Sequence, residues 1–544
     1  MGVQQNKPIF HLSKKYFLVV DDFSNFRLTV RSTLKSFGVP DIDDAVNGED
    51  AIRKISVKKY DIILCDYNLG TGRNGQQVLE EVKYRKLIDY STIFIMVTAE
   101  NTMPMIMGAL EYQPDEYLLK PFTRGILEKR LREHIEKKEI IKDVEHAVEQ
   151  MDYSKAITLC DEIIGTKPRN LNDLLKLKGE ILIKKTDYDA AADLYEDVLT
   201  KGFIPWAMLG NGKVKFITGN YREAKDIFEA IIAKNNKIMS AYDWLAKTLR
   251  KMKKLQEAQQ TLMTATRISP KAILRQKALG GIAYANKDYS TARRSFKETV
   301  EQGKHSCFKS PSDYTGLAKT LVDMEVPEEG LGVLNDLRNE FPGSPEASLE
   351  VAVTEGLIYK KMDREDEAKK AVKTAMQLAG NISGPIPADV ELDLAKACFL
   401  TGDEAKGTEI VRRIVQSNHD NDDLLDHAEG IFKDLQMEEK GREIVTLAKN
   451  EIIKLNNDGV DLVKKDDLAK AIEYFEKAAK NWPENRIINA NAALSLILYM
   501  KKCGCNNYYL DNAQKYLNRV TDIDPSYNKL PDLLSMYRGL TQEN

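Results

Sequence analysis

After about position 150 the chain repeats a spaced pair of small residues, and this repeat constrains the fold of most of the sequence. The two members of each pair lie twelve positions apart, and the first seven second members follow one another at intervals of 33 to 39 residues. Amphipathic helical stretches surround the pairs. Small side chains at this spacing let two antiparallel helices approach closely, so a stack of helical hairpins is expected. The pairs are Gly179/Ala191, Gly212/Ala224, Ala246/Ala258, Gly280/Ala292, Ala318/Gly330, Gly356/Ala368, Ala395/Gly407 and Gly459/Ala471.

This pattern resembles the tetratricopeptide repeat, over about residues 151–535 and about nine or ten units. The stretch 420–455 is degenerate, and the last unit, near Ala513, carries an insertion around 503–507. The resemblance implies an all-α superhelix, an α-solenoid, which presents a concave protein-binding surface and has no catalytic site of its own.

The first region, about residues 14–137, has a different pattern, in which short apolar runs alternate with helical stretches. Strand and helix alternating five times predict an α/β doubly wound, five-stranded parallel sheet covered on both faces. The predicted strands are 17–20, 44–46, 62–65, 93–97 and 117–119, and the predicted helices are 25–37, 49–56, 76–84 and 122–135.

Four of these apolar runs end on polar side chains that a strand does not need in order to fold. In a parallel sheet the ligand site lies outside the carboxyl ends of the strands, so these side chains are expected to gather there. Carboxylates at one sheet edge repel each other unless a cation lies among them, and oxygen ligands without His or Cys indicate a hard ion, most plausibly Mg²⁺. The residues are Asp21, Asp22, Asp66, Thr98 and Lys120.

This constellation resembles the receiver domain of two-component response regulators, the chemotaxis-type, flavodoxin-like fold, over the whole of 14–137. The resemblance implies that Asp66 is the phospho-acceptor. Asp21 and Asp22 would be the acidic pair at the metal, and Asn68 would give it a backbone carbonyl. Lys120 would pair with a phosphoryl oxygen, because charge on the transferred group must be neutralised.

Further roles follow from the same resemblance. Thr98 would hydrogen-bond the phosphoryl group, and Tyr117 would be the aromatic switch that turns inward when Thr98 moves. The Lys120-Pro121 peptide bond is expected to be cis. Asn68 and Glu100 flank the site and have the types found in the chemotaxis receiver, so a short-lived phosphoryl group is predicted.

The sequence departs from the receiver pattern after Asn68, where the usual proline is missing and the loop is about one residue longer. The segment 69–75 is rich in glycine, but no Gly-Lys-Ser/Thr follows, which argues against a phosphate-binding P-loop. A flexible connection is the favoured interpretation of this loop. Residues 138–150 are expected to form a linker helix, and two alternatives stay open: a stiff helix continuous with the receiver, or two helices with a polar joint at 136–139.

Basic residues fall at positions that face the concave groove in this repeat type. One hypothesis is a basic stripe that binds an acidic helix or peptide, and the favoured alternative is a row of solvated lysines. The residues are Lys213, Lys247, Arg250, Lys277 and Lys319.

Composition narrows the functional class. Lys and Arg total 80 and Asp and Glu 83, so the basic excess of a general nucleic-acid binder is absent, as is a helix-turn-helix. No apolar run reaches the length of a membrane span, and the six cysteines are expected to be free thiols in a cytoplasmic protein. No enzyme is predicted beyond the receiver's own phosphotransfer and autodephosphorylation.

The sequence therefore predicts a response regulator whose output is protein binding. A sensor histidine kinase or phosphotransfer protein would phosphorylate Asp66 with Mg²⁺, and the faces 103–111 and 117–129 would change. That change would alter receiver dimerisation or docking against the repeats, and an unknown protein or peptide would be captured or released. Two alternatives stay open: a phosphate sink or adaptor whose repeats hold a sensor kinase, and a constitutive repeat scaffold with a regulatory receiver.

Overall fold

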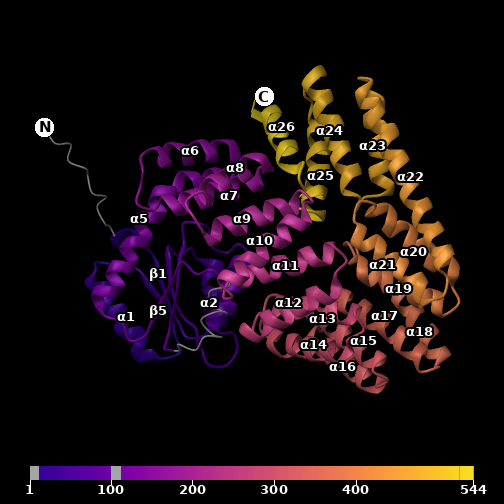
Figure 1. The fold of residues 1–544 in the computed structure, drawn as a ribbon, viewed down its shortest axis with the longest axis horizontal. Helices are drawn as coiled ribbons and strands as arrows, with labels where there is room; N and C mark the ends of the chain where they lie inside the picture. Colours follow the sequence, from indigo (N-terminus) through magenta and orange to yellow (C-terminus); the bar gives the residue numbers. More distant parts are fainter. Residues whose placement is uncertain (1–11, 100–111, 526, 543–544) are drawn as a thin grey trace. The chain divides into compact units, whose positions relative to one another are not determined.

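The computed structural model describes residues 12–99, 112–525 and 527–542. The chain divides into two compact units, Met1–Asp313 and Tyr314–Asn544. The first unit contains a parallel sheet with its covering helices and then a run of helical hairpins (Figure 1). The second unit is built from further hairpins.

The sheet near the N-terminus has five parallel strands in the order β2-β1-β3-β4-β5. This order reverses direction between β1 and β3, and in open α/β sheets such a switch point is where ligands bind. The predicted doubly wound fold is confirmed, and the second strand begins two residues earlier than predicted. The strands are β1 Phe17–Val20, β2 Ile42–Ala45, β3 Ile62–Asp66, β4 Ile93–Thr98 and β5 Glu116–Leu119.

Helices cover both faces of this sheet, which explains why its strands are apolar on both sides. On one face α1 (Ser24–Ser36) and α5 (Arg124–Glu149) pack their apolar residues against alternate strand residues. On the other face α2 (Gly48–Val57) and α3 (Gly75–Tyr84) pack against the remaining ones.

Helix α5 is a single helix of 26 residues that begins at a Thr123 cap. Its first half places Leu127 and Leu131 in the core of the sheet domain. Its second half places Val144 and Val148 in the core of the first hairpin, with α6. The linker region is thus one continuous helix, without a joint at 136–139.

The hairpins of the first unit depend on the small residues that recur in the sequence. A Cβ atom on Gly179 would lie 2.6 Å from the Tyr195 hydroxyl, and one on Gly212 would lie 2.6 Å from the Phe228 ring. Each glycine therefore makes room for a large side chain four positions after the second small residue. The helices are α6 Tyr153–Gly165, α7 Leu171–Lys184, α8 Tyr188–Leu199, α9 Pro205–Ile217, α10 Tyr221–Lys234, α11 Met239–Lys251, α12 Leu255–Ile268, α13 Ile273–Ala285 and α14 Tyr289–Gly303.

Helix α15 (Pro311–Asp323) spans the boundary between the units, and the second unit continues the hairpin pattern. The degenerate stretch 420–455 is helical, and the insertion near 503–507 joins two helices. The helices are α16 Pro327–Glu340, α17 Pro345–Lys361, α18 Glu365–Asn381, α19 Ala388–Leu400, α20 Glu404–Ser417, α21 Asp422–Asp434, α22 Glu438–Lys464, α23 Leu468–Asn481, α24 Arg486–Cys503, α25 Asn507–Ile523 and α26 Leu530–Gln542.

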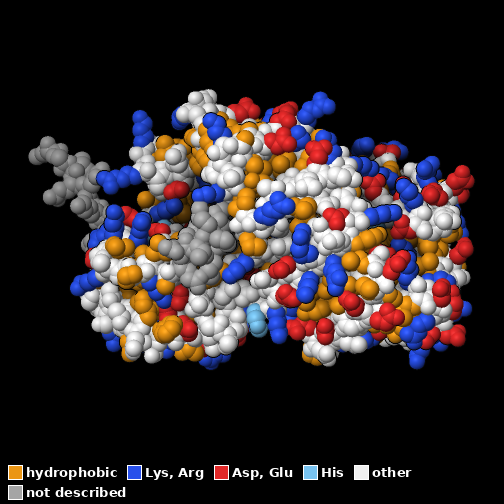
Figure 2. Space-filling view, turned by 60° about the horizontal axis from the view of Figure 1, so that its bottom comes forward, with side chains coloured by type: hydrophobic (Ala, Val, Ile, Leu, Met, Phe, Trp, Pro, Cys, Tyr) orange, Lys and Arg blue, Asp and Glu red, His pale blue; other side chains and the backbone are white. Residues whose placement is uncertain are grey.

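Two surface properties bear on function. Among the described residues, no helix is both long enough and apolar enough to cross a bilayer. On the face shown in Figure 2, acidic and basic side chains are interspersed, which agrees with the net charge of -3.

Candidate functional site

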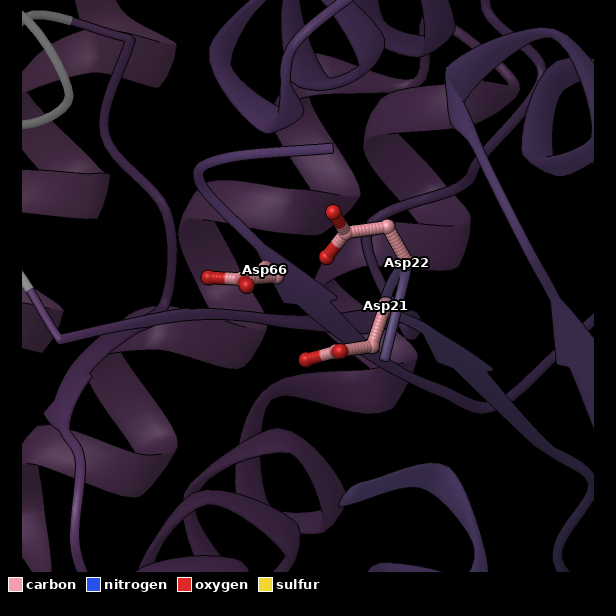
Figure 3. Close-up of side chains that lie close together, drawn as sticks. All are labelled: Asp21, Asp22 and Asp66. Atoms are coloured by element: carbon pink, nitrogen blue, oxygen red, sulfur yellow. The ribbon is translucent and has the colours of Figure 1, made fainter. Parts of the chain in front are cut away.

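Three aspartates meet at the carboxyl ends of β1 and β3, at the switch point of the sheet. Asp66 is the last residue of β3, and Asp21 and Asp22 directly follow β1 (Figure 3). One carboxylate oxygen from each lies within 4.8 Å of the others. The strand register explains the proximity, because Val20 pairs with Cys65 and so brings the next residues of both strands together.

The donor set fits a hard divalent cation. All three ligand atoms are carboxylate oxygens, which Mg²⁺ and Ca²⁺ prefer, and within the described part of the chain no sulfur or imidazole ligand joins the group. Asp21 and Asp66 are buried while Asp22 is exposed. A cation would therefore contact protein on its buried side and remain open to solvent on the other. Asp21 is oriented by the backbone N–H of Phe23, which donates to its carboxylate at 2.8 Å.

Lys120 lies between two of these carboxylates. Its ammonium donates to Asp21 at 2.6 Å and to Asp66 at 2.9 Å. It also lies 3.9 Å from the centre of the Phe26 ring, a cation–π contact that no sequence motif indicates. The Lys120-Pro121 bond is cis, as predicted.

The electrostatics of Asp66 reflect this crowded site. Burial raises the pKa of the Asp66 carboxyl to about 6, against hydrogen bonds from Lys120 and from the backbone N–H of Asn68, while Asp21 adds to the rise. Near neutral pH the group remains an available nucleophile, and its anionic form depends on Lys120.

The remaining predicted receiver residues lie around this centre. Thr98 ends β4 and is buried, one residue beyond the strand partner of Asp66. Tyr117 on β5 is half-buried and packs against the core under α2 and α3. Asn68 is exposed, and Glu100 and the predicted face 103–111 lie outside the described residues.

The glycine-rich loop 69–75 is held by side-chain contacts, whereas its composition favours a flexible connection. Arg73 contacts Glu49 at 3.3 Å and Glu81 at 2.9 Å. Asn74 caps α3 through a reciprocal pair of hydrogen bonds with Gln77. A Cβ atom on Gly75 would lie 2.1 Å from the Asp66 carbonyl oxygen, so the first residue of α3 must be a glycine and lies directly against the acceptor.

The basic residues predicted for the groove fall into two groups. Lys213 and Lys247 lie on α9 and α11, at 5.6 and 4.7 Å from the ring centre of Trp244. Burial lowers the pKa of Lys213, and the neighbouring Lys247 adds to the lowering. Glu180 opposes this lowering of the Lys213 pKa.

The other basic residues are already engaged. Lys277 contacts Asp313 at 2.9 Å, and Lys319 contacts Asp393 at 2.7 Å. Arg250 is not free either. The hypothesis of a basic stripe is therefore reduced to Lys213 and Lys247 beside Trp244, with Lys176 close enough to Lys213 to lower its pKa.

Comparisons with known families agree with this architecture. Residues 17–132 match the response regulator receiver domain, and residues 240–271 and 349–382 match the tetratricopeptide repeat. The chemotaxis protein CheY of Pseudomonas aeruginosa is 28% identical over 120 residues, which are 22% of this chain and 95% of that protein. CheY-3 of Vibrio cholerae is 28% identical over 114 residues, 21% of this chain and 86% of that protein.

Solved structures of both kinds are also similar to parts of the chain. A CheY-like receiver from Methanospirillum hungatei matches 23% of this chain and 96% of that one, at 24% identity and a TM-score of 0.21. A tetratricopeptide repeat protein from Parabacteroides merdae matches 48% and 98%, at 15% identity and a TM-score of 0.31. The chain thus carries a CheY-like receiver domain followed by tetratricopeptide repeats.

Proposed function

We propose that this receiver–repeat chain is a response regulator of a two-component phosphorelay, in which Asp66 accepts a phosphoryl group from a histidine kinase or phosphotransfer protein. The observation that carries the proposal is the placement of Lys120 between Asp66 and Asp21 at the switch point of the sheet. Phosphoryl transfer needs a positioned nucleophile and cations that neutralise the charge on the transferred group. Asp66 would be the nucleophile, and Lys120 is a cation placed beside it.

The reaction transfers a phosphoryl group from a histidine imidazole of the donor to the Asp66 carboxylate. An Asp66 carboxylate oxygen forms the new P–O bond, and the P–N bond of the donor's phosphohistidine breaks, leaving its imidazole. Lys120 and Thr98 would neutralise and hydrogen-bond the charge on the phosphoryl oxygens. Mg²⁺, held by Asp21, Asp22, Asp66 and the Asn68 carbonyl, would supply further charge stabilisation.

The phosphoryl group is expected to be short-lived, because residues at these flanking positions set how easily the attacking water enters, and Asn68 and Glu100 have the types found in the chemotaxis receiver. No other enzymatic reaction is proposed. Thr98 would move when it hydrogen-bonds the phosphoryl group, and Tyr117 would then turn inward, which changes the surface of the receiver.

The output we propose is protein binding by the repeats. Lys213 and Lys247 beside Trp244, with Lys176 near Lys213, favour a partner with an acidic segment. In an alternative, that partner is the sensor kinase itself and the receiver drains its phosphate. In another, the repeats are a constitutive scaffold and the receiver only regulates it.

The proposal is tested by treating the full chain with acetyl phosphate and Mg²⁺ and measuring its intact mass. We expect one phosphoryl group on the wild type and on Asp41→Asn, an exposed position outside the site, and none on Asp66→Asn. Omitting Mg²⁺ should reduce the modified fraction strongly. Equal modification of Asp66→Asn and the wild type would rule out Asp66 as the acceptor.

A further inference from the structure

Besides the continuous helix α5, the receiver and the repeats of the first unit contact each other through the segment between α14 and α15. Residues 304–310, which connect α14 to α15 and are called here the connection, pack against α3 of the receiver. The residues of this contact are other than 117–129, one of the two faces at which the sequence predicts the response to phosphorylation; the other face, 103–111, lies outside the described residues.

A buried polar contact lies at the centre of this interface. The Ser306 hydroxyl donates to the Glu80 carboxylate at 3.1 Å, and both residues are at least 94% buried. The Gln76 amide donates to the other oxygen of Glu80 at 3.0 Å. Since a buried carboxylate is costly without such donors, Glu80 needs Ser306 in the position that the structure gives it.

An aromatic contact lies beside the polar one. The Phe308 ring packs edge-on against Tyr84, with centroids 5.6 Å apart, and stacks on Tyr112 at 6.4 Å. Lys83 donates to the backbone oxygens of Tyr112 and Gln113 at 2.6 Å each, which holds this part of the receiver surface in place. The connection therefore bridges α3 and the segment that leads into β5.

The connection is also held from the side of the repeats. Lys277 on α13 donates to the Phe308 carbonyl, to Ser310 at 3.0 Å and to Asp313 at 2.9 Å. The connection is thus attached to the hairpin stack through the Lys277 side chain as well as through its own backbone. A displacement of the connection would therefore be transmitted to α13.

On the receiver side, α3 begins at the phospho-acceptor. Gly75 has no room for a side chain beside the Asp66 carbonyl, and its N–H donates to the Tyr67 carbonyl at 2.8 Å. Tyr67, the residue after Asp66, places its hydroxyl 3.5 Å from the amide oxygen of Gln76, which in turn holds Glu80. Closely packed contacts thus run from Asp66 to Ser306 without a gap.

We propose that the connection is an intramolecular latch on the α3 face of the receiver, and that a phosphoryl group on Asp66 releases it. This rests on the proposed function for the phosphoryl group, but the docking contact itself does not. In the structure the latch is closed and Lys120 donates to Asp66. A phosphoryl group on Asp66 would compete for Lys120 and alter the packing of Tyr67 and Gly75 at the start of α3. If this opens the latch, then by linkage an open latch favours the phosphorylated form.

The connection contains a native probe for the test. Cys307 is half-buried, and burial raises the pKa of its thiol to about 11, with Glu80 and Glu81 adding to the rise. The thiolate is the nucleophile that attacks a reagent such as iodoacetamide and displaces its iodide, so docking should slow the labelling of Cys307. Cys503 is exposed and serves as an internal reference in the same sample.

The experiment labels the full chain with iodoacetamide at pH 8 and follows each cysteine by peptide mass mapping. With Mg²⁺ and beryllofluoride, we expect the Cys307 rate relative to Cys503 to rise by about tenfold or more in the wild type, since release restores a more ordinary thiol. Asp66→Asn should not respond. An unchanged ratio in wild type that carries beryllofluoride would overturn the release.

A second variant tests the latch without any phosphoryl chemistry. Tyr84 is 64% exposed, so Tyr84→Ala should fold normally while removing a contact to Phe308. We expect faster Cys307 labelling in Tyr84→Ala without beryllofluoride, and no change in the control Phe203→Ala, an exposed aromatic elsewhere in the repeats. Equal rates in Tyr84→Ala and wild type would overturn the docking, whereas failure of Asp66 to accept a phosphoryl group would overturn the proposed function instead.

Discussion

At the residue scale, some groups of the site can be predicted from the ends of the apolar strands, and others cannot. Asp21, Asp22 and Asp66 are predictable, because apolar runs that end on carboxylates must bring them to one sheet edge. Phe26, which lies under Lys120, is not predictable, because a single aromatic on a helix has no motif that distinguishes it from an ordinary core residue.

Glu145 on α5 gives a prediction about pH. Burial raises the pKa of its carboxyl to about 7 from 4.5, with Asp115, Glu149 and Asp89 adding to the rise and Lys138 opposing it. Between pH 4.5 and about 7 the folded chain binds more protons than the unfolded chain, so the free energy of unfolding falls as pH rises through this window.

Glu145→Gln should remove this fall in the free energy of unfolding, because glutamine does not titrate. We expect the variant to be more stable than wild type by about 1–2 kcal/mol at pH 8, after allowance for solvent screening, and to approach or fall below it at pH 5. Urea unfolding at both pH values checks the result. A difference between variant and wild type that does not change with pH would contradict it.

At the scale of elements, the hairpins show what a spacing pattern can and cannot reveal. The small pairs predicted that two helices approach closely, and the structure adds the reason: Tyr195, Phe228 and their equivalents fill the space that each glycine leaves. The sequence left the linker undecided, because amphipathic spacing across 136–139 is compatible both with one helix and with two.

Neighbouring glycines on α13 give a matched test of this packing. A Cβ atom on Gly280 would lie 2.9 Å from the Phe296 ring, whereas one on Gly281 would meet no atom within 4 Å. Gly280→Ala should therefore lower the free energy of unfolding by about 1–2 kcal/mol through overpacking, and Gly281→Ala should raise it by up to about 1 kcal/mol through helix propensity. Urea unfolding followed by circular dichroism compares them, and the reverse order would contradict the packing argument.

The lysine cluster around Trp244 gives a second prediction at this scale. Reversing the charge of Lys213 and Lys247 together should reduce binding of a fluorescent oligoglutamate peptide at least tenfold, because two neighbouring cations are replaced by anions. Fluorescence anisotropy at low salt measures the affinity. Lys225→Glu, which changes an ion pair with Glu229 on α10, is the control. Undiminished binding by the double variant would leave these lysines as a solvated face.

At the scale of the whole molecule, the latch could not have been predicted. Ser306 and Glu80 are 226 positions apart, and neither belongs to a motif. Their contact depends on where the hairpin stack carries residues 304–310, which follows from the accumulated geometry of every repeat before them.

The latch also makes a prediction about the receiver chemistry. Because coupling between two sites is reciprocal, Phe308→Ala should raise the affinity of Asp66 for beryllofluoride and Mg²⁺ by about 5-fold or more, although residue 308 belongs to the repeats. A titration followed by intrinsic fluorescence or calorimetry measures the affinity, with Phe203→Ala as the control. Identical affinities in Phe308→Ala and wild type would show that the two sites are uncoupled.

Helix α5 has a consequence for how such chains can diverge. Because one unbroken helix anchors Leu127 and Leu131 in the sheet and Val144 and Val148 in the first hairpin, its residue count sets a rotational phase between them. Each inserted residue would turn everything that follows by about 100°, and seven would nearly restore the original direction. The number of residues between these anchors is therefore more constrained than a linker's would be, and deletions or insertions there should survive only in numbers close to whole turns.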